Sequence, residues 1–359
     1  MVAMSTKKKR VIVGMSGGVD SSVCAHILKE QGYDVVGVTM KIWQNDDMAN
    51  DGGCCGLSAV NDARRVADSL SIPFYVLDFR EEFKKTVIDY FIREYFKGRT
   101  PNPCIACNRH VKWEAFLEKS LGLEADFIAT GHYAKIERLE NGRFAIKGSF
   151  ENKKDQSYAL YNLTQFQLEK TLMPLGNYSK EEIRDIAKSI GLDVANKPDS
   201  QEICFIPDND YGNFLKNNSD YEALTGDFVD INGNKIGTHN GIIYYTVGQR
   251  KGLGAFGKPM FVKNINPTKN EVMLGSDSDV FENSLICDDI NMMAIGEIVG
   301  EIDVLAKTRY SQKLAKAKIK KDGERIICNF LEPQRAITPG QSAVFYDEIG
   351  NILCGGTIT

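Results

Sequence analysis

Short apolar runs alternate with helical patterns through the first half of the chain. The apolar runs, each of which predicts a strand, are residues 11–13, 35–40, 73–79 and 127–130, and the first predicts a buried one. The segments with apolar positions at helical spacing are residues 23–29, 57–70, 83–97 and 111–121. Strands separated by helices predict an α/β fold with a parallel, doubly wound sheet. A ligand of such a sheet binds at the carboxyl ends of its strands.

The pattern changes after residue 210. Before that point we expect two more helices within residues 164–191, the second capped by Ser179. Beyond it, helical periodicity fades, and short alternating runs are joined by the turns Asn232-Gly233, Asn240-Gly241 and Asp322-Gly323. We therefore expect three domains: an α/β domain over residues 1–209, a small β-rich central domain over 210–279 and a C-terminal β-barrel over 280–359.

A loop rich in glycine and serine joins the first predicted strand to the first predicted helix. Its residues are Gly14, Met15, Ser16, Gly17, Gly18, Val19, Asp20, Ser21 and Ser22. The glycines leave backbone N–H groups free to surround an oxyanion, the helix start adds its positive dipole end, and the serines add hydroxyl donors. Asp20 is a candidate Mg²⁺ ligand. No lysine ends the loop, so it differs from the Walker-type loop. It resembles the loop of the ATP pyrophosphatase (PP-loop) superfamily, whose members split ATP into AMP and pyrophosphate.

Composition limits the partners and the compartment. The 359 residues carry a net charge of −4, so any RNA contact must come from local basic patches. The sequence predicts neither a secretory signal nor a transmembrane helix, and we expect no membrane partner. Nine cysteines in such a chain favour buried, metal-binding or reactive thiols over a disulfide framework.

Two cysteine motifs are candidates for chemistry. The first is Thr100-Pro101-Asn102-Pro103-Cys104-Ile105-Ala106-Cys107-Asn108, in which two prolines predict an extended loop and Cys107 is expected to open a helix. A helix start favours the thiolate form of a cysteine. The second motif is the polar loop around Cys204. The C-x-x-C pair alone predicts a redox dithiol, part of a metal or iron–sulfur site, or one catalytic cysteine beside a bystander.

The glycine-rich loop and the two cysteine motifs together strongly resemble the tRNA-uridine 2-sulfurtransferases (tRNA-specific 2-thiouridylases), the enzymes that thiolate the wobble uridine of tRNA. The resemblance covers nearly the whole chain. Further motifs that carry it are Ala129-Thr130-Gly131-His132-Tyr133-Ala134, Lys154-Asp155-Gln156-Ser157-Tyr158, the run from Tyr245 to Gly254, Arg309-Tyr310 and Pro339-Gly340-Gln341.

The resemblance implies roles for particular residues. It implies that ATP is held by Gly14–Ser21 together with Met40 and Gly131. It implies that Asn102, Pro103 and Cys104 meet the target uridine, and that tRNA is contacted by Lys154, Asp155, Gln156, Arg309 and Tyr310. Cys204 matches the persulfide carrier and Cys107 the second catalytic cysteine. Some members of the family carry Asp at the position of Cys104.

The implied reaction is ATP-dependent 2-thiolation. Adenylation of the uridine 2-oxygen releases pyrophosphate and makes AMP the leaving group. A Cys204 persulfide then attacks the ring, and Cys107 attacks Cys204 to leave a Cys107–Cys204 disulfide that an external reductant resets. Such a reaction needs a cysteine desulfurase or a sulfur-relay protein as donor. In a rival mechanism, Cys104, Cys107 and Cys204 ligate a [4Fe–4S] cluster with one open iron.

Two other functions remain open from the sequence: an ATP-pyrophosphatase-type ligase that makes a small molecule, and a nucleotide-gated RNA-binding protein without chemistry. Reduced thiols and tRNA predict a cytoplasmic protein. The other cysteines have simpler interpretations. Cys54 and Cys55 are expected to be structural or incidental, and the members expected in the core are Cys24, Cys287, Cys328 and Cys354. His132 is a candidate site residue or an oriented structural histidine.

Overall fold

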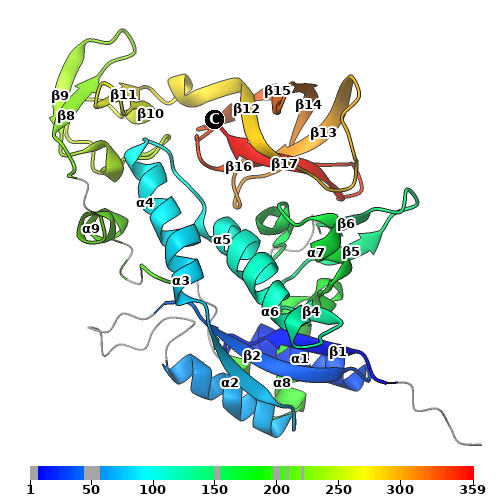
Figure 1. Cartoon of the computed structure of the whole chain (residues 1–359). Helices are drawn as coiled ribbons and strands as arrows, with labels where there is room; N and C mark the ends of the chain where they lie inside the picture. The colour runs from blue at the N-terminus through cyan, green and yellow to red at the C-terminus, as the bar shows by residue number, and fades with distance from the viewer. Residues whose placement is uncertain are drawn as a thin grey trace, which may run out of the picture. The chain divides into compact units, whose positions relative to one another are not determined.

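The computed structural model describes residues 7–43, 57–148, 154–196, 203–206, 208, 210–219 and 222–359. The chain forms two compact units (Figure 1). The first contains Met1–Val87 and Cys104–Pro207, and the second contains Ile88–Pro103 and Asp208–Thr359. No helix among the described residues is long and apolar enough to cross a membrane.

A parallel sheet forms the centre of the first unit. Its strands, in the order β3-β2-β1-β4-β7, are β3 (Phe74–Asp78), β2 (Asp34–Lys41), β1 (Arg10–Gly14), β4 (Phe127–Ala129) and β7 (Thr171–Leu172). Neighbouring strands are parallel throughout, with Val13 opposite both Gly37 and Ala129. The predicted α/β class and the parallel sheet are confirmed.

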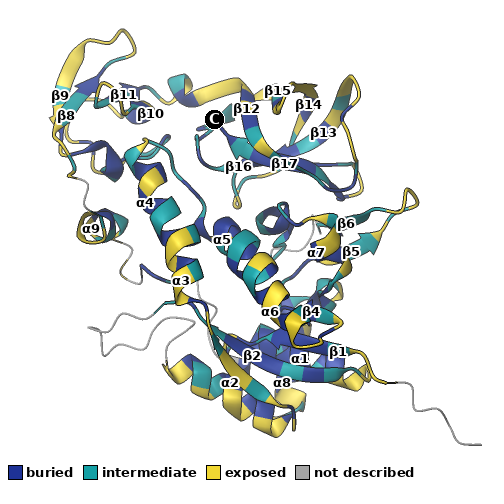
Figure 2. Ribbon diagram, viewed as in Figure 1, coloured by how far each residue is buried: buried dark blue, intermediate teal, exposed yellow. Residues whose placement is uncertain are grey.

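Helices α1 (Val19–Glu30) and α2 (Leu57–Ser69) pack against this sheet, and α8 (Lys180–Ser189) packs against α1 (Figure 1). Their apolar faces and the strands share one core, which includes Val13, Val23, Leu28, Ala63 and Ile183, and all five are almost inaccessible to solvent. Figure 2 shows the buried parts of β1 and β2 in dark blue. Burying each of the larger aliphatic side chains stabilises the fold by about 2 kcal/mol. The core therefore fixes the start of α1, and with it the loop that precedes α1.

Two long helical segments are each wound partly as π-helix. The first comprises α3 (Arg80–Phe83), a π-helical stretch over Lys84–Ile88, and α4 (Asp89–Phe96). The second comprises α5 (Pro103–Ala106), a π-helical stretch over Cys107–Phe116, and α6 (Leu117–Gly122). The second segment corrects one expectation, because the helix begins at Pro103 and not at Cys107. Proline is favoured in the first helical turn, where its missing N–H costs nothing.

Smaller elements complete the first unit. They are the hairpin β5 (Lys135–Arg138) and β6 (Phe144–Lys147), helix α7 (Gln165–Glu169), and 3₁₀ turns at Ser157–Leu160, Pro174–Asn177 and Asp193–Asn196. Ser179 caps α8 as predicted: its hydroxyl accepts from the Glu182 N–H, and the Glu182 carboxylate accepts from the Ser179 N–H.

The second unit contains two β structures. The first is a four-stranded sheet in the order β10-β11-β8-β9, formed by β8 (Gly226–Val229), β9 (Lys235–His239), β10 (Phe261–Asn266) and β11 (Glu271–Gly275). Helix α9 (Tyr211–Asn217) precedes it, which corrects the expectation that helical structure fades at residue 210. The Asp210 side chain caps this helix by accepting from the Asn213 N–H.

The second β structure is a closed barrel in the order β12-β15-β14-β13-β16-β17. Its strands are β12 (Phe281–Met292), β13 (Glu301–Lys307), β14 (Ala315–Asp322), β15 (Arg325–Arg335), β16 (Ser342–Tyr346) and β17 (Ile352–Ile358). The predicted C-terminal barrel is confirmed. Cys287, Cys328 and Cys354 lie in its core as expected, and burial raises the pKa of the Cys287 thiol to about 12. These thiols are protonated at neutral pH, which makes them poor nucleophiles.

Candidate functional site

A pocket in the first unit lies where β1, β2 and β4 end. One wall is the glycine-rich loop and the start of α1, represented by Gly14, Met15, Ser16, Asp20 and Ser21. A second wall comes from β2 and the residues after it, namely Thr39, Met40 and Ile42. The third wall is formed by Lys112, Thr130, Gly131, His132 and Gln156. The pocket is thus at the carboxyl ends of adjacent parallel strands, where an α/β sheet binds its ligand.

The glycine-rich loop needs glycine at position 17. Gly17 has φ +70°, in the left-handed region, and a Cβ there would lie 2.3 Å from the backbone oxygen of Ala59 in α2. The Ser16 N–H donates to Ser21 Oγ at 3.1 Å. The Ser21 and Ser22 hydroxyls both donate to the Gly18 carbonyl, at 3.2 and 2.8 Å. Ser21 lines the pocket, whereas Ser22 is fully buried and is not among the lining residues. Ser22 is therefore removed from the candidate phosphate donors.

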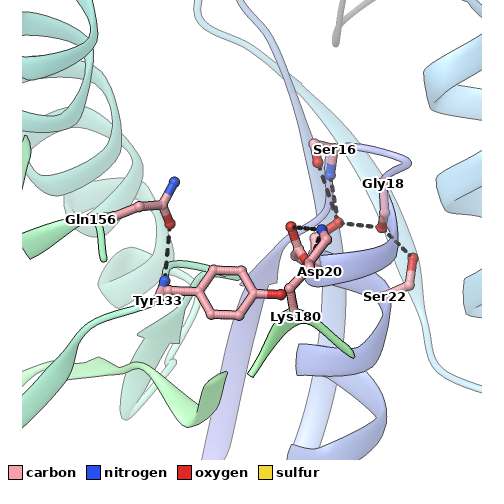
Figure 3. Close-up of polar contacts among 8 residues, drawn as sticks. Ser16, Gly18, Asp20, Ser22, Tyr133, Gln156 and Lys180 are labelled. Atoms are coloured by element: carbon pink, nitrogen blue, oxygen red, sulfur yellow. Dashed lines mark hydrogen bonds and ion pairs between the residues drawn. The ribbon is translucent and has the colours of Figure 1, made fainter. Parts of the chain in front are cut away.

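Asp20 is held by two side chains from other segments (Figure 3). The Lys180 ammonium lies 2.8 Å from both carboxylate oxygens, and the Tyr133 hydroxyl donates to Oδ1 at 2.6 Å. The Lys180 side chain is only 8 % exposed and that of Asp20 is 30 % exposed. Lys180 is the first residue of α8, where a positive charge is unfavourable for the helix dipole, so its placement depends on Asp20. The pair fastens α8 to the start of α1.

Gly131 and Gln156 bring two more motifs to this pocket. A Cβ on Gly131 would lie 2.8 Å from the backbone of Asp20 and Ser21, so the chain after β4 passes directly against the start of α1. Gln156 is fixed through Tyr133, since the Tyr133 N–H donates to the Gln156 side chain and the Gln156 N–H donates to the Tyr133 carbonyl. A residue that the resemblance implies for tRNA therefore lines the same pocket as residues implied for ATP.

His132 is oriented in the pocket wall. Its Nδ1 lies 2.8 Å from the Thr130 hydroxyl, and its ring packs against Trp113 with centroids 5.5 Å apart. Burial, with a smaller effect from the nearby Lys112 ammonium, lowers the pKa of His132 well below its ordinary value of 6.5. His132 is neutral at physiological pH and is a hydrogen-bonding group rather than a cation.

This shift has a consequence for stability. Because the unfolded chain binds a proton at His132 more readily than the folded chain does, the folded state loses stability as pH falls below 6.5. The loss is limited to about 1.4 kcal/mol per pH unit. We expect the wild-type protein to lose more stability than His132→Gln between about pH 7.5 and pH 5.5, measured by urea unfolding. His26→Gln is the control, and equal losses in wild type and His132→Gln would contradict the assignment.

The helix that carries Cys104 and Cys107 differs from the predicted arrangement. Cys104 lies in the first turn, next to Pro103, and is exposed, whereas Cys107 lies one turn later and is half-buried. The argument from the helix start therefore applies to Cys104 and not to Cys107. Cys107 instead opens the π-helical stretch, a feature that is rare and occurs often at functional sites.

Cys204 lies in a short turn that is anchored by its neighbours. The Ile206 N–H donates to the Ile203 carbonyl, and Phe205 is buried with its ring 5.7 Å from that of Phe83 in α3. Cys204 itself is half-buried. Helix α3 also contacts the π-helical stretch that carries Cys107, so both cysteines belong to segments packed against α3. Residues 197–202 of this motif, like Cys54 and Cys55, lie outside the described residues.

Thr100 joins three motifs within the second unit. Its N–H donates to the Pro339 carbonyl, its carbonyl accepts from the Gln341 side chain at 2.6 Å, and its hydroxyl donates to the Thr246 hydroxyl. These motifs are far apart in sequence, and the side chains of Thr246 and Gln341 make two of the three contacts. The segment before Asn102 and Pro103 is thereby held in place.

The other residues implied for tRNA are in differing environments. Lys154 and Asp155 are half-buried, and Asp155 accepts from the Ser157 N–H. Arg309 Nη2 donates to the carbonyls of Val247 and Ala336 and to Thr338 Oγ1, so this guanidinium is bound within its own unit. Tyr310 is 44 % exposed.

Asp20 and the three motif cysteines differ in how well they fit the two implied metal groups, Mg²⁺ and an iron–sulfur cluster. The Asp20 carboxylate accepts three hydrogen bonds, which leaves about one of its four lone-pair sites for Mg²⁺. One carboxylate with phosphate oxygens and water is a common Mg²⁺ environment, so Asp20 fits as a single ligand. For an iron–sulfur cluster, no three His, Cys, Asp or Glu side chains gather as a metal site within the described part of the chain, which includes Cys104, Cys107 and Cys204. The three thiols as placed do not fit a cluster.

Sequence reasoning missed several residues of the pocket. Lys112 and Lys180 were not singled out, and Tyr133 was named only as part of a motif. A usable signal existed for Lys180, because a lysine directly after a serine cap opposes the helix dipole and implies a partner elsewhere. No local signal identifies Lys112, since its role depends on the helix winding.

Comparison with known families and proteins identifies the chain. Three family models match it: the tRNA methyl transferase HUP domain over residues 9–208, the tRNA methyl transferase PRC-barrel domain over 212–276, and the aminomethyltransferase beta-barrel domain over 282–358. The tRNA-specific 2-thiouridylase MnmA of Lachnoclostridium phytofermentans is 60% identical over 97% of this chain and 98% of its own length. The proteins of that name from Clostridium tetani (MnmA 2) and Clostridioides difficile are 57% and 58% identical, over 99% and 98% of both chains. With this similarity over almost its full length, and with the glycine-rich loop, Met40, Gly131 and Gln156 around one pocket, the chain belongs to the tRNA-specific 2-thiouridylase family.

Proposed function

We propose that this protein is the sulfurtransferase that converts the wobble uridine of tRNA to 2-thiouridine at the cost of ATP. The observation that carries the proposal is the pocket of the first unit. It combines the glycine-rich loop and Met40 with Gln156, in a chain that belongs to the 2-thiouridylase family. The proposed domains are residues 1–209 for catalysis, 210–279 for tRNA binding and 280–359 for the barrel.

ATP occupies the pocket in this proposal. The backbone N–H groups from Gly14 to Ser21 and the hydroxyls of Ser16 and Ser21 bind its phosphates, since the first turn of α1 has no capping side chain. Met40 and Gly131 contact the nucleoside. Asp20 would hold Mg²⁺ as a single ligand, and the bound ion would supply charge compensation for the pyrophosphate. Lys180 and Tyr133 keep the Asp20 carboxylate in one orientation.

The target uridine is bound by Asn102, Pro103 and Cys104. The base has to leave its stack to reach a buried site. Its 2-oxygen attacks the α-phosphorus of ATP, and the electron pair of the broken P–O bond leaves with pyrophosphate. The wider tRNA contacts fall on Lys154, Asp155, Gln156, Arg309 and Tyr310, of which Arg309 acts mainly by fixing the loop beside Tyr310.

Sulfur transfer follows on two cysteines. The terminal sulfur of a Cys204 persulfide attacks C2 of the adenylated uridine. The Cys107 thiolate attacks the inner sulfur on Cys204, which breaks the persulfide bond, leaves sulfur on the ring and expels AMP. The product is a Cys107–Cys204 disulfide, so an external dithiol must supply two electrons for the next turnover. The persulfide comes from a cysteine desulfurase or a sulfur-relay protein. We place the enzyme in the cytoplasm, where thiols are kept reduced.

The test measures 2-thiouridine in an unmodified wobble-uridine tRNA transcript. Chelated, iron-free protein is incubated without oxygen with ATP, Mg²⁺, cysteine, a cysteine desulfurase and a dithiol. We expect thiouridine to form, and AMP to form only when tRNA is present. Thiolation only after cluster reconstitution would move the cysteines to iron ligation. AMP formation without tRNA and without thiouridine would favour a small-molecule ligase instead.

A further inference from the structure

Lys112 lies in the pocket wall in a fixed pose. It is half-buried, and its ammonium donates to Asn108 Oδ1 at 2.8 Å. Asn108 is 3 % exposed, and its own Nδ2 donates to the Ala159 carbonyl at 2.9 Å. The amide is therefore fixed at both ends, and so is the ammonium bound to it. Nothing in the sequence motifs assigns a role to Lys112.

The π-helical winding places Lys112 on the same face as Cys107. In a π-helix the hydrogen bonds join residues i and i+5, so residues five apart lie about one turn from each other. In an α-helix, with 3.6 residues per turn, the same two residues would point about 140° apart. Because Cys107–Phe116 is wound as a π-helix, one helical face carries both the thiol and the ammonium. The rare π-helical winding thus brings the Cys107 thiol and the Lys112 ammonium to one face of the helix.

Lys112 also determines the charge of the pocket. The charged side chains in the described lining are those of Asp20 and Lys112. Asp20 is already neutralised by Lys180, and His132 is uncharged. Among the described residues, Lys112 has no carboxylate partner. Its ammonium donates to the neutral side chain of Asn108. The pocket therefore keeps one positive charge for a ligand, and the ligand chemistry that matches it is a phosphate.

The other lining residues indicate which phosphate lies nearest to Lys112. The glycine-rich loop supplies the amides and hydroxyls suited to the terminal phosphates, and Met40 lies on the wall that would contact the nucleoside. Lys112, Gln156 and Gly131 all line the pocket. Gln156 belongs to the motif implied for tRNA, and Gly131 is assigned above to the nucleoside. The base and the nucleoside therefore share the pocket with Lys112. The phosphate that joins the nucleoside to the pyrophosphate, and that the base attacks, is the α-phosphate.

We propose that Lys112 is a catalytic residue of the adenylation step, on the basis of the function proposed above. Its ammonium contacts a non-bridging oxygen of the α-phosphate. When the uridine 2-oxygen bonds to phosphorus and the bond to pyrophosphate breaks, negative charge grows on the phosphoryl oxygens, and a cation fixed beside them stabilises that charge. Lys112 thus supplies part of the charge compensation at the α-phosphate from the protein itself.

The experiment compares Lys112→Gln, Lys112→Arg and Lys188→Gln, the last being an exposed lysine on α8. One readout is the rate of tRNA-dependent AMP formation at saturating ATP and tRNA. The other is affinity for α,β-methylene-ATP, in which the scissile bond cannot break. We expect Lys112→Gln to slow AMP formation by about 100-fold or more, with less than about a fivefold change in analogue affinity. Lys112→Arg should recover at least about tenfold of the rate, and Lys188→Gln should match wild type.

Three results would overturn the proposal. They are a wild-type rate in Lys112→Gln, a loss of analogue affinity as large as the loss of rate, and no recovery in Lys112→Arg. The second would mean that Lys112 serves folding or ground-state binding. The wild-type protein separates this proposal from the function beneath it. If wild type forms thiouridine and Lys112→Gln is as fast, only the role of Lys112 fails; if wild type forms neither AMP with tRNA nor thiouridine, the proposed function fails.

Discussion

Cys204→Ser should abolish formation of 2-thiouridine, with a loss of at least about 1,000-fold. A serine hydroxyl cannot form a persulfide, so no sulfur reaches the ring, whereas adenylation does not use this residue. We expect tRNA binding and α,β-methylene-ATP binding to stay within about threefold of wild type. The measurement is thiouridine by mass spectrometry of digested tRNA, alongside binding of both ligands.

Cys328→Val is the matched control for removal of a thiol. Cys328 is buried in the barrel core, and valine is close to it in size and apolar, so thiolation should be retained. If Cys204→Ser lost tRNA affinity in proportion to activity, Cys204 would be a structural residue of its turn and not the sulfur carrier. The packing of Phe205 and Ile206 beside it makes this comparison necessary.

Lys180→Met should destabilise the first unit by about 3 kcal/mol, the scale expected when one partner of a mostly buried ion pair is removed. The remaining Asp20 carboxylate would keep only the Tyr133 hydroxyl of its two recorded partners and would lose its orientation. Because Asp20 lines the pocket, ATP affinity should fall as well. Urea unfolding and titration with α,β-methylene-ATP measure the two effects.

A double-mutant cycle tests whether the effect belongs to the pair. Asp20→Asn removes the negative charge, so adding it to Lys180→Met should cost less than the two single changes together, with a coupling of about 2 kcal/mol. Lys188→Met, at the exposed end of the same helix, should change stability by less than about 0.5 kcal/mol. Additive single effects would show that Lys180 stabilises α8 by packing its methylene groups rather than by pairing with Asp20.

The order of elements could be predicted from local patterns. Buried strands of a parallel sheet are apolar on both faces, and helices repeat every 3.6 residues, so both leave signals within a few residues. The strands β1 to β4, the cap at Ser179 and the start of the barrel near Phe281 were predicted for this reason. The glycine-rich loop was equally legible, because only glycine accepts the left-handed backbone at Gly17.

Predictions failed where a short stretch of sequence is compatible with more than one local structure. The helix at Pro103 was placed four residues late, because two prolines indicate an extended loop as readily as a helix start. Helix α9 was missed, since its seven residues are too few to show periodicity above noise. The sequence also predicts Ser22 as a phosphate donor, but the packing of α1 buries it, and its hydroxyl donates to the Gly18 carbonyl.

The sequence by itself determined the class of fold, the ATP loop and the set of cysteines, because each depends on contiguous residues whose conformation or chemistry is local. Tertiary structure alone decided which side chains meet in the pocket. Lys180 reaches Asp20 across 160 positions, Gln156 is fixed through Tyr133, and the π-helical winding brings Lys112 to the face of Cys107. These contacts depend on how helices pack on the sheet and on the free energy gained by burying their apolar faces, and no short stretch of sequence records that balance.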